Sequence, residues 1–218
     1  GTFAHGAMVE AAKYGTVNCV ASSRDIKYTR IPELDKSKFD AGADYFYICT
    51  NNTIFGTRYP ELPDVGNVPL VADMSSNILS EEYDVTKFGL IFAGAQKNIS
   101  PAGLTLVIVR KDLLTDPMPF TPKIMNFKMQ DANGSMINTP STYSIYMAGL
   151  CMEWLKEQGG VKAMQQINIE KATLLYDALD DSRLFHGIAD SEFRSRMNVT
   201  FTSGSEDGQG GTQKPQEQ

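Results

Sequence analysis

Residues 68–109 read VPLVADMSSNILSEEYDVTKFGLIFAGAQKNISPAGLTLVIV, and this stretch decides the fold. Three short apolar runs in it, 69–72, 88–92 and 104–109, have the length and the branched side chains of buried strands. Upstream, residues 45–49 form another run of this kind. Strands joined by long connections are typical of an α/β protein with a mostly parallel sheet, which is the fold class that we expect.

An acid and a lysine follow two of these runs. Asp73 comes directly after the first run, and Lys97 lies just past the second, before a turn rich in serine, proline and glycine. Ligand groups in open α/β sheets gather beyond the carboxyl ends of the strands, so both side chains are expected to face one crevice. A lysine can form a Schiff base with an aldehyde cofactor, and pyridoxal phosphate also needs a carboxylate against its ring nitrogen. Lys97 and Asp73 are candidates for these two groups; the alternative is a solvated ion pair.

Composition limits the class of protein. The 218 residues, 42% of them hydrophobic, suffice for one large domain or for one domain plus part of another. A net charge of -6 and a pI near 5.0 argue against nucleic acid as a partner. The apolar runs are too short to span a bilayer, so we expect a soluble protein that does not bind a membrane.

The cysteines and histidines carry no metal-site pattern. Cys19, Cys49 and Cys151 are odd in number and far apart, and two of them lie in apolar runs, which predicts buried free thiols in a reducing compartment such as the cytoplasm. With only His5 and His186 and no Cys/His cluster, a zinc site is not expected.

Helical and strand patterns fill the rest of the chain. Helices are predicted at 4–14, 143–155 and 161–179, and further strands at 16–21, 185–188 and 197–201. The apolar stripe of the last helix, which includes Leu174 and Leu175, is expected to face the core. Arg194 and its neighbouring arginines are expected to be solvated charges at a sheet edge.

Two polar segments leave alternatives open. Residues 50–53, TNNT, follow a predicted strand and form either a turn or a ligand loop. Residues 138–142, NTPST, precede a predicted helix and serve either as its cap or as a phosphate site. The chain also begins without methionine at Gly1 and ends in a polar, glycine-rich segment at 202–218 that we expect to be disordered, which suggests a piece of a longer protein.

Three segments carry a resemblance to a known family. ADMSSNILS at 72–80, DVTKFGLIFAGAQKNISPAGLT at 84–105 and SMINTPSTYSIYMAGLCMEWLKEQGG at 135–160 resemble the corresponding segments of the phosphoserine aminotransferases, which belong to the class V pyridoxal-phosphate aminotransferases. The similarity runs to about Phe201. It implies the aspartate-aminotransferase-like fold (fold type I), a mostly parallel sheet with helices on both faces.

The resemblance also implies site residues. Lys97 would bind the cofactor aldehyde as a Schiff base and then act as general acid and base, and Asp73 would hold the pyridine nitrogen. Gln96 would contact the cofactor phosphate, and Thr53 the cofactor ring. Asn52 stands where the family often has glutamate.

Three further positions match family residues. Asn138 and Thr139 would reach the phosphate of the partner subunit's cofactor, which implies a homodimer with shared active sites. Phe3 lies where the family usually has a tryptophan that stacks on the pyridine ring; phenylalanine keeps the π surface and loses the indole N–H.

The implied reaction transfers an amino group from glutamate to 3-phosphohydroxypyruvate, giving O-phosphoserine and 2-oxoglutarate in serine biosynthesis. The implied domains are a cofactor-binding large domain at 1–155 that lacks its N-terminal part, the start of a small α+β domain at 156–201, and the disordered tail at 202–218. The family's groups that bind the substrate anions would lie outside the chain, so this piece alone is expected to be weak or inactive. The alternatives are another class V enzyme, of the alanine–glyoxylate aminotransferase or cysteine desulfurase type, and a non-catalytic dimerisation fragment.

Overall fold

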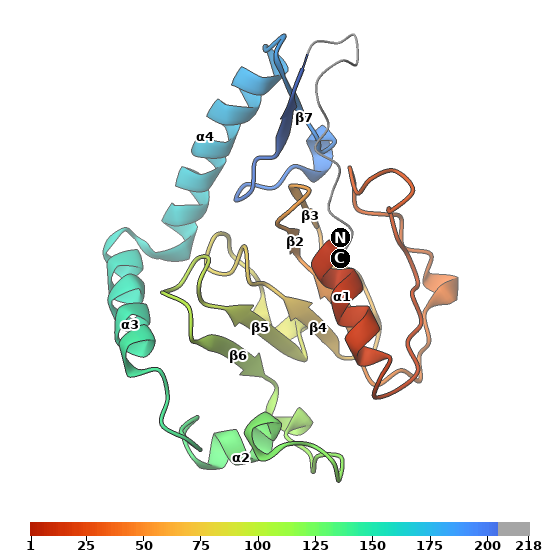
Figure 1. Ribbon diagram of the computed structural model, residues 1–218, viewed down its shortest axis with the longest axis vertical. Coiled ribbons are helices and arrows are strands. Elements are labelled where there is room, and N and C mark those ends of the chain that lie inside the picture. The colour runs from red at the N-terminus through yellow and green to blue at the C-terminus, as the bar shows by residue number, and fades with distance from the viewer. Residues whose placement is uncertain (205–218) are drawn as a thin grey trace. The chain divides into compact units, whose positions relative to one another are not determined.

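The computed structural model describes residues 1–204 (Figure 1). Its helices are α1 (Thr2–Ala11), α2 (Phe127–Ala132), α3 (Thr142–Glu157) and α4 (Gly160–Asp180). Its strands are β1 (Phe46–Cys49), β2 (Asn51–Asn52), β3 (Thr57–Arg58), β4 (Leu70–Asp73), β5 (Leu90–Gly94), β6 (Thr105–Val109), β7 (Phe185–Gly187) and β8 (Phe201–Ser203). Short 3-10 helices are η1 (Lys36–Lys38), η2 (Val85–Lys87), η3 (Lys111–Leu113), η4 (Lys123–Met125) and η5 (Ser191–Phe193).

The chain divides into two compact units, which are described separately. Unit 1 comprises Gly1–Asp35, Asn51–Leu62 and Gln166–Gln218, of which the last described residue is Gly204. Unit 2 comprises Lys36–Thr50 and Pro63–Gln165. These units are groups of residues in contact, so the predicted domain boundary at 155/156 stays a prediction.

Unit 2 is built on one four-stranded sheet in the order β1-β4-β5-β6. β1 and β4 are parallel, β4 and β5 are parallel, and β6 returns antiparallel to β5. The turn back between β5 and β6 ends at Gly103, whose φ of 111° favours glycine because side chains disfavour positive φ. The predicted α/β class with a mostly parallel sheet is therefore confirmed.

The core of unit 2 follows the alternation of its strands. Leu70 and Ala72 of β4 are buried, as are Ile91 and Ala93 of β5, and each is at most 2% exposed. Successive side chains of a strand point to opposite faces, so these four residues mark one face on each strand. Burying an isoleucine or leucine side chain stabilises a fold by about 1.5–3 kcal/mol, and most of the buried apolar residues within 1–204 belong to unit 2.

Unit 1 has a different interior. It contains two short antiparallel pairs, β2 with β3 and β7 with β8, and most of α4. The Ser195 hydroxyl donates to Asn51 Oδ1 at 2.5 Å and accepts from the amides of Met197 at 3.1 Å and Asn198 at 2.9 Å. Asn51 in turn donates to Asn198 Oδ1 at 2.7 Å. Hydrogen bonds thus hold the β2–β3 hairpin to the 195–198 segment.

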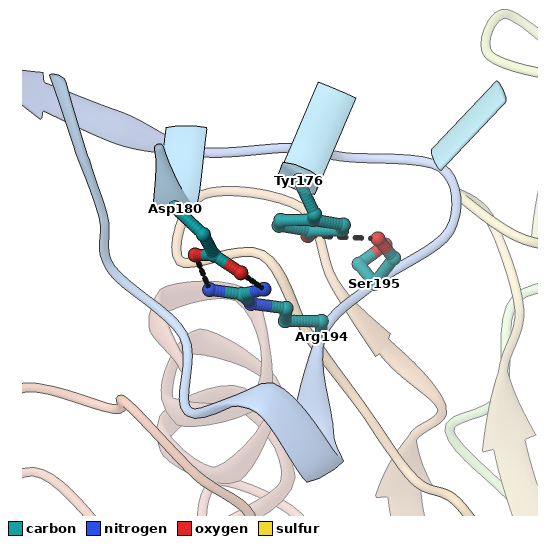
Figure 2. Close-up of polar contacts among 4 residues, drawn as sticks. All are labelled: Tyr176, Asp180, Arg194 and Ser195. Carbon is teal, nitrogen blue, oxygen red and sulfur yellow. Dashed lines mark hydrogen bonds and ion pairs between the residues drawn. The ribbon is translucent and has the colours of Figure 1, made fainter. Parts of the chain in front are cut away.

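The same segment is joined to α4 (Figure 2). The hydroxyl of Tyr176, which is buried, donates to the main-chain oxygen of Ser195 at 2.9 Å, and Arg194 donates two hydrogen bonds to Asp180 at 2.7 and 2.5 Å. The Arg194 guanidinium also lies 4.5 Å from the centre of the Tyr176 ring, within range of a cation–π interaction. Burial raises the pKa of Tyr176, whereas the hydrogen bonds from Arg194 lower the pKa of Asp180.

Several predictions from the sequence are wrong. Residues 16–21 form no strand and are largely exposed, as is Cys19, because no neighbouring strand among the described residues pairs with their backbone. α4 buries Asn168, Ala172 and Tyr176, while Leu174 is 73% exposed. Arg194 is a structural ion-pair partner with a side chain only 19% exposed.

The other predicted helices and strands agree with the structure to within a few residues at their ends, except that the strand predicted at 197–201 overlaps β8 only at Phe201. The sequence did not predict α2, β2 or β3. The predicted tail starts too early, because Thr202 and Ser203 belong to β8. The rest of that prediction, 205–218, lies outside the described residues.

Candidate active site

The parallel strands bring three polar loops to one edge of the sheet in unit 2. Cys49, the last residue of β1, is in register with Asp73, the last residue of β4, and Asp73 is in register with Phe92 of β5. Parallel strands end at a common edge, so Thr50 and the loops that begin at Met74 and Ala95 lie next to each other. The acid and the lysine predicted to share a crevice are thus carried by adjacent loops.

Lys97 sits on a tight turn. The amides of Ile99 and Ser100 both donate to the main-chain oxygen of Ala95, at 3.0 and 2.9 Å, which closes the turn around Gln96, Lys97 and the next residue. Ala95 and Ile99 are buried, while Gln96 and Lys97 are exposed. Buried apolar residues therefore anchor the turn on both sides, while Gln96 and Lys97, the two candidate site residues in it, are exposed.

Three hydrogen bonds join the loop that follows Asp73, called the acid loop, to β5 and to the turn that carries Lys97. Met74 donates its amide to Phe92 at 2.9 Å, and the Gly94 amide donates to the Ser75 hydroxyl at 3.0 Å. The Asn98 side-chain amide donates to the main-chain oxygen of Ile78 at 2.7 Å. The relative position of the two loops is thus set by direct contacts on both sides of Lys97.

Asp73 is held at one carboxylate oxygen and at its main chain. Its Oδ1 accepts from the Ser75 amide at 2.8 Å, and its main-chain oxygen accepts from the amide and the hydroxyl of Thr50 at 3.1 and 3.2 Å. Within residues 1–204, no hydrogen bond reaches Oδ2, and Asp73 forms no ion pair with Lys97. Asp73 is therefore not paired with Lys97, and one of its carboxylate oxygens remains available to a ligand.

A chain of hydrogen bonds that begins at two buried residues also holds the acid loop. The Thr50 hydroxyl donates to Asn77 Oδ1 at 2.7 Å, Asn77 donates to the Tyr83 hydroxyl at 2.9 Å, and Tyr83 donates to Glu81 at 2.8 Å. Thr50 and Asn77 are at most 1% exposed. Nearby, burial raises the pKa of Tyr47 far above its ordinary value, with smaller contributions from Cys49 and Asp73, so this tyrosine stays protonated.

Ser75 and Asn77 were missed by the sequence reasoning. Short polar side chains directly after a strand bond readily to nearby main-chain groups, and ADMSSN shows three of them in a row. That pattern marks a structured turn. It does not say which groups the turn will contact.

Asn138 and Thr139 lie in unit 2, in the loop before α3. Both are exposed, and neither side chain forms a hydrogen bond within residues 1–204. The cap of α3 is Ser141, but its side chain makes no capping bond; it instead lies 2.9 Å from the Ser144 hydroxyl, which donates to Ala102 at 2.9 Å. Ser141 therefore does not supply the side-chain capping bond that was one of the two roles considered for residues 138–142.

Phe3 and Thr53 belong to unit 1. Phe3 is in the first turn of α1 and is 50% exposed. Thr53 is in the loop that joins β2 to β3, so the TNNT segment supplies both a strand and a turn. Gly1, just before α1, lies so close to the Asn52 side chain that an added Cβ would clash, which places the start of α1 against the hairpin that carries Thr53.

Residues 1–204 contain no group of three or more acidic, histidine or cysteine side chains arranged to hold a metal ion. Within the same residues, no helix is both long enough and apolar enough to cross a bilayer.

Comparison with known proteins identifies the family. The family described as Aminotransferase class-V matches residues 4–209. A curated relative from Bacillus cereus, named phosphoserine aminotransferase, is 52% identical over 207 residues, which cover 95% of this chain and 58% of the relative. The chain thus spans little more than half the length of that relative.

Solved structures agree with this result. A phosphoserine aminotransferase from Bacillus circulans subsp. alkalophilus superposes with a TM-score of 0.89 at 39% identity, covering 94% of this chain and 57% of that one. A phosphoserine aminotransferase from Trichomonas vaginalis with bound PLP superposes with a TM-score of 0.86 at 39% identity, covering 93% and 57%. The predicted fold type I architecture is confirmed, and the chain belongs to the class V aminotransferase family.

Proposed function

We propose that the complete protein is a phosphoserine aminotransferase that uses pyridoxal 5'-phosphate. The observation that carries the proposal is the placement of Asp73 and Lys97 on adjacent, cross-linked loops at the carboxyl edge of a parallel sheet. The names of the relatives support the substrate class, and the PLP-bound Trichomonas structure supports the cofactor. The proposed substrates are glutamate and 3-phosphohydroxypyruvate, and the products are 2-oxoglutarate and O-phosphoserine.

The residues of unit 2 fit this cofactor. Asp73 Oδ2 accepts no hydrogen bond from the described residues, so it is available to a protonated ring nitrogen, and Lys97 extends from an exposed turn. When bound, pyridoxal phosphate supplies an aldehyde carbon that binds an amine and a ring that accepts the electron pair released at the substrate carbon. The Asp73 carboxylate keeps the proton on the ring nitrogen, which maintains that electron demand.

Lys97 performs the proton transfers in this proposal. Its Nζ would hold the cofactor through the aldehyde carbon and, as a free amine, would lie beside the substrate carbon. Lys97 then removes the α-proton as a general base and returns a proton as a general acid. Gln96, exposed next to Lys97, is proposed to donate to the cofactor phosphate.

Four other residues are proposed on the family resemblance. Phe3 stacks on the pyridine face and Thr53 contacts the ring. Asn138 and Thr139 contact the phosphate bound by a partner subunit, which requires a homodimer; their exposed side chains lack hydrogen-bond partners within residues 1–204, which supports an external ligand. The proposed domains are those given above, and the proposed location is the cytoplasm.

The test compares Lys97→Ala with Lys87→Ala, an exposed lysine at the end of η2, in the complete gene product. Wild type and Lys87→Ala are expected to show the visible absorbance of lysine-bound cofactor and to transfer the amino group from glutamate to 3-phosphohydroxypyruvate. Lys97→Ala should lose that absorbance and at least about 100-fold of the turnover, because it removes the general acid and base. Retained absorbance in Lys97→Ala would disprove the assignment, and wild-type turnover restricted to alanine and glyoxylate would favour another class V activity.

A further inference from the structure

Ser75 contacts both the acid and the strand that carries the lysine turn. Its amide donates to Asp73 Oδ1 at 2.8 Å, and its hydroxyl accepts from the Gly94 amide at 3.0 Å. Gly94 is the last residue of β5, and Lys97 follows it in the adjoining turn. Ser75 thus links the Asp73 carboxylate to the end of the strand that leads into the turn of Lys97.

The hydroxyl of Ser75 occupies a specific place in the sheet. Met74, the residue after β4, donates to the main-chain oxygen of Phe92 in β5 at 2.9 Å. On the other edge of β5, the Ala95 amide donates to Leu104 at 3.0 Å. Donors alternate between the two edges of a strand, so the Gly94 amide faces β4. β4 has ended at Asp73, and the Ser75 hydroxyl accepts the bond that a further strand residue would have taken.

The orientation of the Asp73 carboxylate depends on this arrangement. The terminal torsion of an aspartate is broad, so the carboxylate needs a hydrogen bond to be held in one orientation. Within residues 1–204, the Ser75 amide is the donor that reaches this carboxylate. Where the amide of Ser75 lies therefore determines where Oδ2 points.

We propose that Ser75 is a positioning residue that aims the Asp73 carboxylate at the ring nitrogen of the pyridoxal cofactor, a role that rests on the proposed function. Ser75 acts through Asp73: the bond from Gly94 holds the Ser75 hydroxyl, and the turn then places the Ser75 amide on Oδ1. Without the hydroxyl, the Gly94 amide loses its acceptor and the turn is free to rotate away from the carboxylate.

The loss is expected to be local. The Thr50 amide still donates to the main-chain oxygen of Asp73, and Asn98 still ties the lysine turn to Ile78. Ser75→Ala therefore keeps the fold of both loops while relaxing the direction of one carboxylate. This separates a positioning role from a general structural role.

The experiment uses the complete protein with pyridoxal phosphate labelled with ¹⁵N in the ring. The ¹⁵N chemical shift reports whether the ring nitrogen carries a proton, which is the property that Asp73 controls. The variants are Ser75→Ala, Ser75→Thr, which keeps a hydroxyl, and Ser75→Cys, whose sulfur is a weaker acceptor. Ser100→Ala is the matched control, because its hydroxyl lies in the lysine turn and donates to Pro101 at 3.0 Å without linking the loops.

Wild type, Ser100→Ala and Ser75→Thr are expected to show a protonated ring nitrogen. Ser75→Ala should shift the signal toward the unprotonated ring and weaken cofactor binding by about 5-fold, the effect of one lost hydrogen bond, with Ser75→Cys in between. A wild-type shift in Ser75→Ala, or in Ser75→Cys if the alanine variant does not fold, would overturn the inference and leave the proposed function intact. A defect that Ser75→Thr does not restore would also overturn it. Failure of the wild type to bind the cofactor through Lys97 would instead refute the proposed function.

Discussion

The two units differ in what they bury. Unit 2 is held by apolar side chains on alternating strand positions, as with Leu70 and Ile91, whereas the buried residues of unit 1 are mostly polar and include Asn51, Thr57 and Ser195. Buried polar groups stabilise a structure only when they are hydrogen-bonded, so unit 1 depends on the completeness of its network and unit 2 on the filling of its core. Packed interiors tolerate small changes of shape, while hydrogen-bond networks tolerate little loss of a partner.

The difference also separates the proposed site residues by the way they are held. Asp73 and Lys97 extend from loops at the end of an apolar sheet, and further hydrogen bonds tie those loops together. Thr53 extends from a hairpin whose first residue, Asn51, is held through Ser195. A defect in one kind of support should therefore affect Thr53, and a defect in the other should affect Asp73 and Lys97.

The largest effect on stability is expected in the core of unit 2. Ile91 is 2% exposed, so Ile91→Ala should lower the free energy of unfolding by about 2–5 kcal/mol because it leaves a cavity. Ile91→Val, which removes one methylene, should cost about 0.5–1.5 kcal/mol. Urea denaturation followed by circular dichroism measures both values, and an alanine variant as stable as wild type would show that the sheet core does not dominate unit 2.

The network of unit 1 should respond to loss of one oxygen atom. Ser195→Ala removes a hydroxyl that donates to Asn51 and accepts two main-chain amides, so we expect a loss of about 1–3 kcal/mol even though little volume is removed. Ser191→Ala, at an exposed serine in η5, is the control and should stay within about 0.5 kcal/mol of wild type. Equal stability of the two variants would contradict the polar account of unit 1.

The ion pair beside this network should contribute the least and should depend on pH. Asp180 is half exposed, so Asp180→Asn is expected to lower stability at pH 7 by less than about 1 kcal/mol. The pKa of Asp180 is lowered in the folded state, mainly by hydrogen bonds from Arg194, so its contribution is present above the ordinary value of 3.8 and is lost as the pH falls through the folded-state pKa. Urea midpoints of wild type and Asp180→Asn should therefore differ at pH 7 and converge as the pH falls through the folded-state pKa of Asp180; a difference that is constant with pH would argue against the ion pair.

The sequence predicts unit 2 better than unit 1 for the same physical reason. Apolar runs such as 69–72 and 88–92 locate the buried strands, and the strand ends bring Asp73 and Lys97 to one edge. In unit 1, the run at 16–21 forms no strand, since an apolar run does not specify a pairing partner.

Local sequence patterns could not predict hydrogen bonds between residues that are far apart in the chain. In α4, the buried positions Asn168, Ala172 and Tyr176 are four residues apart, and two of them are polar, so the apolar stripe through Leu174 pointed to the wrong face. The link between Asn51 and Ser195 joins residues 144 positions apart. The hydrogen bond between Ser75 and Gly94 could not be predicted for the same reason. A serine after a strand indicates a turn, but it does not indicate which residue the serine contacts.

The identity of the amine that holds the cofactor is the most direct test of the proposed active site. Incubating the complete protein with pyridoxal phosphate, reducing it with borohydride and sequencing its peptides by mass spectrometry locates the trapped pyridoxyl group. We expect it on the peptide that contains Lys97, with none on that peptide in the Lys97→Ala variant. A pyridoxyl group on another lysine of the wild type, or none at all, would contradict the assignment of the active site to the loops at the end of β4 and β5.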